Sequence, residues 1–293
     1  MSMRKRAAAA LAALLGLCVL LAVVAVPRTP AAQTADVAIL MYHAFTEDEA
    51  DTGSLYTPAS EFARQLSALR DAGYTSVGYA DLIEFVNGKG KLPEKPLLIS
   101  IDDGYQNNLD LAAPLLEKYG FCANIAVIGV SIGRTTYKDT DIPITPHFSL
   151  EDARPWIERG VLTVTTHSYD MHQVAAVDGN DCRRSVLQMP GEAEPDYIAA
   201  LTQDYTRAQE QLAGLPGTPL PVFTYPFGAY SELSERVLQA LGVQVTVTTE
   251  GGANRLVKGE PETLRLLHRI HIWRGTKPDM LLSRIDAALQ ALR

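Results

Sequence analysis

The sequence predicts a single α/β domain in which seven or eight parallel strands close into a barrel. Short apolar segments recur through residues 36–293, and segments with helical periodicity separate most of them. Alternation of strand and helix places parallel strands side by side, and about eight such units are enough to close a sheet on itself. Neither an internal repeat nor a low-complexity linker divides the chain after residue 36, so we expect one domain.

The predicted strands are short runs of apolar and β-branched residues, which favour the buried positions of a parallel sheet. The run from Val37 to Tyr42 ends at His43, and the run from Leu97 to Ile101 ends on two aspartates. The predicted strands cover, in order, residues 37–42, 74–77, 97–101, 121–128, 161–166, 221–225, 243–248 and 267–272.

The predicted helices begin and end at ordinary helix signals. Pro58 stands at the start of the first helix, and Ser149 with Asp152 forms a capping box for a later one. Pro114 lies inside the third predicted helix and should kink it. The predicted helices cover residues 57–73, 79–86, 107–119, 149–160, 196–212, 231–242 and 278–292.

Residues 1–35 form a separate segment. Three basic residues, Arg4 to Arg6, precede an apolar run from Ala7 to Val26, and a stretch rich in Pro, Ala and Thr follows. This order is typical of an export signal peptide. The run of about 20 apolar residues is also long enough to span a bilayer, so it could remain as a signal anchor. We therefore expect residues 36–293 to act outside the cytoplasm, either secreted or held at the membrane by this segment alone.

The composition limits the kinds of partner that the protein can bind. The net charge of −8 and the lack of a basic stripe argue against nucleic acid as a partner. Three cysteines are too few for a disulfide framework or a cysteine-based zinc site. Cys18 lies in the apolar run, and Cys122 and Cys182 could pair outside the cytoplasm, although nothing in the sequence brings them together. We expect a monomer.

Ionisable residues gather at the ends of the predicted strands. His43, the Asp102-Asp103 pair and His167 each follow a strand, and the turn 225–228 follows another. Active sites of such barrels lie at the carboxyl ends of the strands, so these residues should share one bowl. Adjacent carboxylates after an apolar strand repel each other unless a cation binds one of them or one stays protonated. The alternative is an ordinary strand-end turn, in which Asp and Gly are common.

A second observation favours a metal. His167 and His172 lie five residues apart in THSYDMH, and a turn between them can bring both imidazoles to one ion. Two His and one carboxylate are a common ligand set for zinc and related divalent metals, and the set leaves a position open for water. Such a metal polarises a carbonyl and lowers the pKa of water, and the remaining Asp can take the proton. Alternatively, His172 is an ordinary surface residue.

Several of these motifs resemble those of the polysaccharide deacetylases, also called the NodB-homology family or carbohydrate esterase family 4. SIDDG is similar to the first motif of the family, usually written TFDDG. HSYDMH resembles the second motif of the branch that deacetylates the biofilm polymer poly-N-acetylglucosamine, and FTYPFG resembles the third motif. The likeness extends from about Ala38 to Ile272, which is most of the chain after residue 36.

The resemblance implies a deformed (β/α) barrel and a metal-dependent mechanism. Asp103, His167 and His172 would bind a divalent metal, for which zinc is the first choice and cobalt, nickel or iron are alternatives. Asp102 would be the general base that activates a water molecule for attack on an N-acetyl carbonyl.

The resemblance also implies an acid and an oxyanion donor. His43 in LMYH matches the His with which the biofilm branch protonates the departing amine; the alternative is a buried His bonded to the backbone. The backbone N–H of Phe227 would help to hold the oxyanion. Tyr225 and Arg269 complete the residues that we group as candidates for oxyanion and substrate binding.

The chain departs from the family pattern at the third motif. The family has an Arg there that contacts the catalytic Asp, and this chain has Thr224. Arg269 is a candidate to orient Asp102 instead, although it could equally be an exposed residue at the barrel end. We rank His268 and His271 below His43 as the acid. Five aromatic residues could stack on sugar rings, although core packing is expected for most of them: Tyr169, Tyr225, Phe227, Tyr230 and Trp273.

The resulting hypothesis is an N-deacetylase that releases acetate from an extracellular polymer containing N-acetylglucosamine. Poly-β-1,6-N-acetylglucosamine is favoured because of the motif branch, and peptidoglycan of the cell wall or chitooligosaccharides come next. A glycan-binding member of the fold without turnover is a second hypothesis, which the intact Asp and His residues argue against. An amidase or cyclic-imide hydrolase of the same superfamily is a third, which the export segment argues against.

Overall fold

The computed structural model describes residues 33–48, 55–217 and 219–293. Its compact domain covers Thr34–Arg293 and so begins two residues before the boundary predicted at residue 36. The predicted export segment, residues 1–35, lies outside the described residues except for its last three. Within the described part of the chain, none of the helices is long and apolar enough to span a bilayer.

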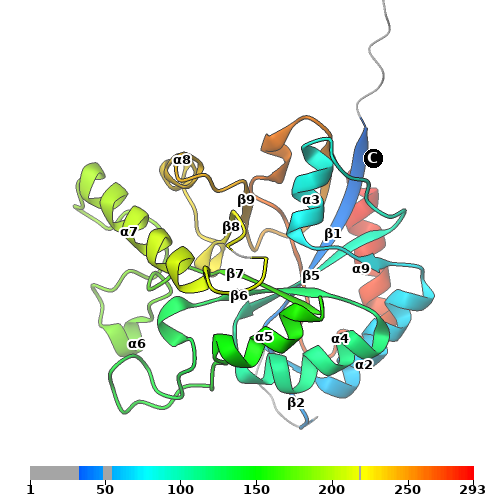
Figure 1. Cartoon of the computed structure of the whole chain (residues 1–293), viewed down its shortest axis with the longest axis horizontal. Helices are drawn as coiled ribbons and strands as arrows, with labels where there is room; N and C mark the ends of the chain where they lie inside the picture. The colour runs from blue at the N-terminus through cyan, green and yellow to red at the C-terminus, as the bar shows by residue number, and fades with distance from the viewer. Residues whose placement is uncertain (1–32, 49–54, 218) are drawn as a thin grey trace, which may run out of the picture. The chain divides into compact units, whose positions relative to one another are not determined.

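Strands form the centre of the domain, and helices surround them (Figure 1). The strands are β1 (Thr34–Tyr42), β2 (Ala44–Thr46), β3 (Tyr56–Pro58), β4 (Thr75–Ser76), β5 (Pro96–Asp103), β6 (Ala123–Val127), β7 (Leu162–Thr166), β8 (Val222–Thr224), β9 (Val245–Val247), β10 (Ala253–Val257) and β11 (Ile270–His271).

The helices lie close to where the sequence predicts them. They are α2 (Ala59–Asp71), α3 (Tyr79–Val86), α4 (Ala113–Tyr119), α5 (Leu150–Glu158), α6 (Ala175–Asp178), α7 (Glu194–Leu212), α8 (Glu232–Ala240) and α9 (Pro278–Gln290), with a π-helical turn η1 (Asn108–Ala112) and 3₁₀ turns η2 (Gly129–Ser131), η3 (Pro226–Gly228) and η4 (Pro261–Leu264). Ser149 accepts the N–H of Asp152, as its capping role predicts. Pro114 lies in the first turn of α4, after η1, rather than at a kink inside one helix.

The strands confirm the deformed barrel. β1, β5, β6, β7, β8 and β9 pair in parallel in that order around the sheet. The segment that contains β11 closes the ring, because Leu267 bridges Val247 of β9 and Ile270 pairs with Leu40 of β1. Closure on the β9 side rests on this single bridge, which makes the barrel irregular there. The short β4 pairs with the first two residues of β5.

The sheet is mixed rather than wholly parallel, because it includes β10, a strand that the sequence did not predict. This strand runs antiparallel to β1, with Thr34 opposite Val257 and Ala38 opposite Ala253. β1 is nine residues long, and β11 covers only Leu40 and Met41 on that edge. β10 therefore satisfies backbone groups of the first half of β1 that would otherwise form an open edge.

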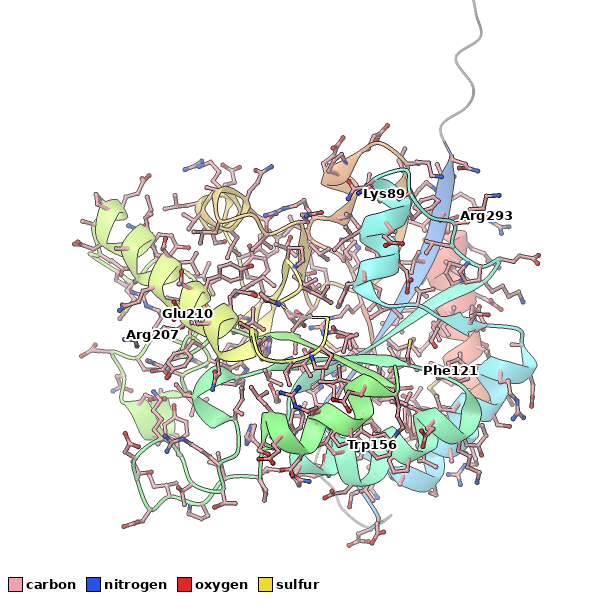
Figure 2. All side chains as sticks on the ribbon, viewed as in Figure 1. Lys89, Phe121, Trp156, Arg207, Glu210 and Arg293 are labelled. Carbon is pink, nitrogen blue, oxygen red and sulfur yellow. The ribbon has the colours of Figure 1, made fainter. Side chains whose placement is uncertain are left out.

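Two apolar layers pack on opposite faces of the strands. Leu97, Ile99 and Ile101 of β5 belong to a layer shared with α2, α4, α5 and α9, in which Phe121 and Trp156 also lie (Figure 2). Leu98 belongs to a second layer, which joins side chains of β1, β8, β9 and α3 across the inside of the ring. The two layers fix which residues of each strand point into the barrel.

The two cysteines within the described residues are both free thiols. Cys122 and Cys182 therefore do not form the disulfide considered from the sequence, and Cys18 lies outside the described residues.

Candidate active site

Strand β5 carries the Asp pair to the mouth of the barrel. Side chains alternate along a strand, so Asp102 points the same way as Leu98, into the ring. Asp103 would point outward by the same rule, but its φ of 75° lies in the left-handed region and breaks the alternation. Gly104 follows with φ of 85°, and a Cβ there would lie 2.8 Å from Cγ1 of Val127. The DDG sequence therefore bends both carboxylates toward one place.

Asp103, His167 and His172 come together as a ligand set. One ligand atom from each lies within 4.8 Å of the others. The Asp103 Oδ1 atom is 3.8 Å from Nε2 of His167 and 3.8 Å from Nε2 of His172. One carboxylate oxygen and two imidazole nitrogens facing a common point are the donors that a divalent transition metal prefers, so these residues fit the metal predicted from the sequence.

The surroundings of His167 prepare it as a ligand. Its Nδ1 lies 2.8 Å from the backbone oxygen of Thr224, which identifies Nδ1–H as the donor and leaves the Nε2 lone pair toward Asp103. Burial lowers the pKa of His167 to about 4, so the ring is neutral near pH 7, as a metal ligand must be. Thr224, the residue that departs from the family's third motif, thus orients His167 by accepting this hydrogen bond with its backbone carbonyl.

Asp204 of α7 fixes the turn between the two histidines through hydrogen bonds to its backbone. Asp204 accepts the backbone N–H of Tyr169 at 2.8 Å and that of Asp170 at 2.7 Å. Ser168 adopts a left-handed φ of 71°, and its Oγ accepts the N–H of Met171. Burial raises the pKa of Asp204 to about 6 despite these two bonds. This arrangement explains how residues five apart can reach one point.

Arg269 pairs with Asp102 inside the barrel. Its Nη1 lies 2.7 Å from Oδ1 of Asp102 and 3.1 Å from Oγ of Ser100, and its Nε donates to the Thr248 backbone oxygen. Burial alone would raise the pKa of Asp102, but the charge of Arg269 and the bond from it hold this pKa well below its usual range. Arg269 is fully buried, so it is not an exposed barrel-end residue and cannot touch a substrate directly.

His43 lies beside the Asp pair at the end of β1. Its Nε2 is 4.0 Å from Oδ2 of Asp102, and its side chain is 15% exposed. Asn108 donates to the His43 backbone oxygen at 2.7 Å, which holds this segment against η1. His43 is thus accessible from the bowl and close to the proposed base. The side chain of His268 is instead 42% exposed, and its Nε2 lies 3.4 Å from a carboxylate oxygen of Glu250.

The third-motif turn places Phe227 at the site and removes Tyr225 from it. Phe227 has φ of 57°, is 47% exposed, and its ring centroid lies 4.2 Å from that of His172. Tyr225 is fully buried in an apolar cluster, and its hydroxyl donates to Glu235. A substrate-binding role for Tyr225 is therefore wrong in this structure. Asp103, Ser168 and Phe227 share positive φ angles, as strained residues at functional sites often do.

A cavity of about 260 Å³ opens beside the ligand set. Its wall combines Asp103 and His172 with polar and aromatic side chains and with apolar side chains from η2 and α6 and from the residues just before them. The apolar residues are Ile128, Val130, Val174 and Val177, and Tyr105, Ile144 and His147 also line the cavity. Burial and a hydrogen bond with Asp103 raise the pKa of the Tyr105 hydroxyl far above its usual range. This volume is just below the usual range for a small-ligand pocket, about 300–1,000 Å³.

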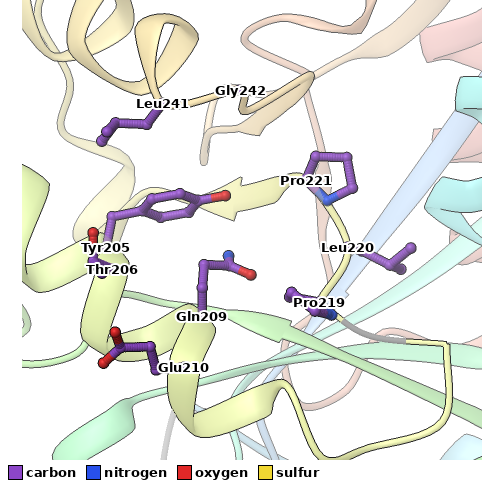
Figure 3. Close-up of a pocket in the computed structure, with 9 residues that line it drawn as sticks. All are labelled: Tyr205, Thr206, Gln209, Glu210, Pro219, Leu220, Pro221, Leu241 and Gly242. Atoms are coloured by element: carbon purple, nitrogen blue, oxygen red, sulfur yellow. The ribbon is translucent and has the colours of Figure 1, made fainter.

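Another cavity lies away from these residues. It has a volume of about 330 Å³ and lies between α7, the segment 219–221 and the end of α8. Figure 3 shows the Tyr205 ring extending across it toward Pro221, with Gln209 below. No carboxylate–histidine cluster borders it among the described residues, so it offers none of the chemistry found at the barrel mouth.

Sequence reasoning missed Tyr105 and Asp204. Tyr105 comes directly after the DDG motif, and its position there was the available signal. Asp204 lies on the buried stripe of α7 between Leu201 and Tyr205. A single acid on the apolar face of an amphipathic helix was the signal in this case, because a buried carboxylate needs donors from another element.

Comparison with known proteins identifies the family to which the chain is similar. A family model for polysaccharide deacetylase matches residues 89–246, more than half of the chain. YxkH of Bacillus subtilis strain 168, provisionally described as a polysaccharide deacetylase, is 27% identical over 259 residues, which cover 88% of this chain and 78% of YxkH.

More distant proteins share parts of the chain or its fold. A poly-beta-1,6-N-acetyl-D-glucosamine N-deacetylase of Escherichia coli K12 is 21% identical over 226 residues, which cover 73% of this chain and 34% of that protein. This chain thus matches about a third of the length of the E. coli enzyme. A solved structure of a de-N-acetylase from Aggregatibacter actinomycetemcomitans superposes with a TM-score of 0.72 at 19% identity, over 85% of this chain and 100% of that one. This likeness shows the same fold.

Proposed function

The chain belongs to the polysaccharide deacetylase family, a family of hydrolases that act on amide bonds, and from this premise we propose that it removes N-acetyl groups from a polymer of N-acetylglucosamine. The observation that carries the proposal is the meeting of Asp103, His167 and His172 within 4.8 Å, next to the Asp102–Arg269 pair. A glycan-binding protein without turnover would have no need for a fixed carboxylate beside such a ligand set.

The three ligand residues would hold a divalent metal, and we propose zinc because two imidazoles and one carboxylate suit it. Bound there, the metal would serve as a Lewis acid, which polarises the acetyl carbonyl and lowers the pKa of water. The remaining steps belong to the side chains of this chain.

Asp102 acts as the general base in this proposal. The pair with Arg269 keeps its carboxylate ionised and fixed, so that it can take a proton from the attacking water. The backbone N–H of Phe227 is proposed to donate to the oxyanion that forms, since the turn that contains Phe227 borders the ligand His172.

His43 acts as the general acid. Its Nε2 lies 4.0 Å from Asp102, on the other side of the doublet from His172 along the sheet, and it donates a proton to the departing amine. Base and acid thus come from neighbouring strands, β5 and β1, and both reach one substrate group.

We propose poly-β-1,6-N-acetylglucosamine as the substrate, with peptidoglycan and chitooligosaccharides as the competing choices. HSYDMH and the named E. coli relative support this choice. We also propose that residues 1–35 direct the enzyme out of the cytoplasm and that it acts as a monomer. Cell fractionation with and without residues 1–35, and light scattering of the purified protein, test these two points.

Acetate release tests the function. The purified protein is stripped with a chelator, reloaded with zinc, cobalt or nickel, and assayed on each of the three glycans. We expect metal-restored release, fastest on poly-β-1,6-N-acetylglucosamine, and loss of release in Asp102→Asn. Faster release from peptidoglycan or chitooligosaccharides would replace the substrate. A fully metal-loaded protein that releases acetate from none of them would be evidence against the function.

A further inference from the structure

Trp273 is one of two aromatic side chains near the bowl that are largely exposed. Its exposed fraction is 45%, against 47% for Phe227, whereas Tyr225 is fully buried. Phe227 contacts the ligand His172, but Trp273 follows β11 and lies beside His271 instead. The two aromatic side chains therefore border different parts of the site.

The indole of Trp273 is held by two neighbouring side chains, Arg284 and His271. The guanidinium of Arg284, on α9, lies 4.2 Å from the ring centroid, and its Nη1 donates to the His271 backbone oxygen at 2.7 Å. The rings of Trp273 and His271 are nearly perpendicular, at 80°, with centroids 5.6 Å apart. An indole fixed in this way is still 45% exposed, so it offers aromatic surface for contact with a ligand, and it loses little conformational freedom when one binds.

His271 connects this aromatic face to the proposed acid. The rings of His43 and His271 have centroids 5.9 Å apart, so Trp273 lies one ring beyond His43. The amine that leaves in the reaction belongs to the sugar, so the sugar chain must lie on the His43 side of the doublet. A polymer that continues past the reacting unit would meet Trp273.

We propose that Trp273 stacks on the sugar ring next to the unit that is deacetylated, and that the enzyme therefore prefers a chain of two or more sugars to a single one. This inference rests on the proposed function. The apolar C–H face of a pyranose packs on an aromatic ring much as another apolar ring does, so Trp273 adds affinity only when a neighbouring sugar is present.

Kinetics on substrates of different length test this role. Trp273→Ala, Trp273→Phe and the parent protein are compared on a β-1,6-linked N-acetylglucosamine pentamer and on an aryl acetate, which has no sugar. We expect kcat/KM of Trp273→Ala to fall about tenfold on the pentamer, mainly through KM, and to stay unchanged on the aryl acetate, with partial recovery in Trp273→Phe. An equal fall on both substrates, or none on the pentamer, would overturn the proposal.

Tryptophan fluorescence gives a second readout that needs no turnover. The chain has two tryptophans, and the other is Trp156 on α5 (Figure 2). The guanidinium of Arg159 lies over its ring, 4.1 Å from the centroid. In full-length Trp156→Phe protein, Trp273 is the only emitter. The pentamer should change its emission, and N-acetylglucosamine at the same sugar concentration should not. In Trp273→Phe protein the pentamer should leave the Trp156 emission unchanged.

The two readouts separate this inference from the function on which it rests. If the pentamer is deacetylated while the Trp273 emission stays constant, the stacking role is wrong and the deacetylase function stands. If the pentamer changes the emission but releases no acetate, Trp273 binds glycan and the proposed function is wrong for this polymer.

Discussion

Arg269 and Asp102 form an ion pair that is almost entirely closed to solvent, with 2.7 Å between Nη1 and Oδ1 and side-chain exposures of 0% and 2%. Removing two charges from water is costly, so such a pair is weak evidence for stability alone. What the pair does provide is a carboxylate that is ionised and fixed at the carboxyl end of β5. The family's third motif has an Arg that contacts the catalytic Asp, and this chain has Thr224 at that position. Arg269, which comes just before β11, makes the contact with Asp102 instead.

Replacing Arg269 should disable the base. In Arg269→Met, burial is no longer offset by the guanidinium, so the pKa of Asp102 rises and the carboxyl is protonated at low pH. We expect kcat to fall about 100-fold or more, and the acid limb of the pH–rate profile to move to higher pH. The free energy of unfolding should drop by about 3–5 kcal/mol, because one buried charge loses its partner. Rate profiles and urea unfolding measure both effects.

Arg265→Met is the matched control. Arg265 lies four residues earlier, is also largely buried, and pairs with Glu235 rather than with a site residue. This variant should lose stability while keeping the pH dependence of the parent. An unchanged acid limb in Arg269→Met would show that the guanidinium does not set the state of Asp102.

The sequence could predict those residues of this site that lie at the ends of strands. His43, the Asp102-Asp103 pair and His167 each come directly after a predicted strand, and parallel strands carry their ends to one side of the barrel. Arg269 is 167 residues from Asp102, and its neighbours show no pattern that distinguishes a buried guanidinium from an exposed one. Its role depends on the barrel closing through the β11 segment, which is a property of the whole fold.

The third motif shows a different limit. Tyr225 and Phe227 are both aromatic and lie two residues apart in a predicted turn, where no strand alternation says which ring faces the site. The φ of 57° at Phe227 separates them, so that one ring enters the core and the other lies against His172. The strand β10 was missed for a related reason, since its pairing with β1 depends on a vacant edge and not on its own short sequence.

Each ligand should be needed for metal affinity. Replacing His172 with Ala, or Asp103 with Asn, is expected to weaken zinc or cobalt binding by 10-fold or more, since removal of only an outer-shell partner already costs about 10–100-fold. Metal titration by calorimetry measures the change. His147→Ala is the control, because His147 borders the same cavity without belonging to the ligand set. Similar metal affinity in the His172 and His147 variants would rule out the assignment.

Asp204 should make stability depend on pH. Its pKa is raised by burial from 3.8 to about 6, so the folded protein keeps a proton that the unfolded chain loses between these values. The stabilising contribution of Asp204 is therefore present below about pH 4 and is lost as pH rises through about 6. Two pKa units correspond to about 3 kcal/mol.

Asp204→Asn cannot titrate and isolates this effect. The unfolding free energy of the metal-free parent, minus that of Asp204→Asn, should decrease by an amount on the order of 3 kcal/mol between pH 4 and pH 7. Urea unfolding at one-unit intervals of pH gives this difference. His167, whose pKa is lowered to about 4, contributes with the opposite sign in the same window, but it does so in both proteins and cancels. A difference that is constant with pH would mean that Asp204 is ionised throughout.

Removing the proposed acid should affect only leaving groups that need a proton. His43→Ala is expected to lower kcat on an N-acetyl substrate by about 100- to 10,000-fold, the usual contribution of a general acid, while metal affinity stays that of the parent. An aryl acetate releases a phenolate that needs no proton, so its hydrolysis should fall far less. His268→Ala, which removes a half-exposed side chain beside Glu250, should behave like the parent on both substrates. Equal losses on the amide and the aryl ester in His43→Ala would assign His43 to positioning rather than to proton transfer.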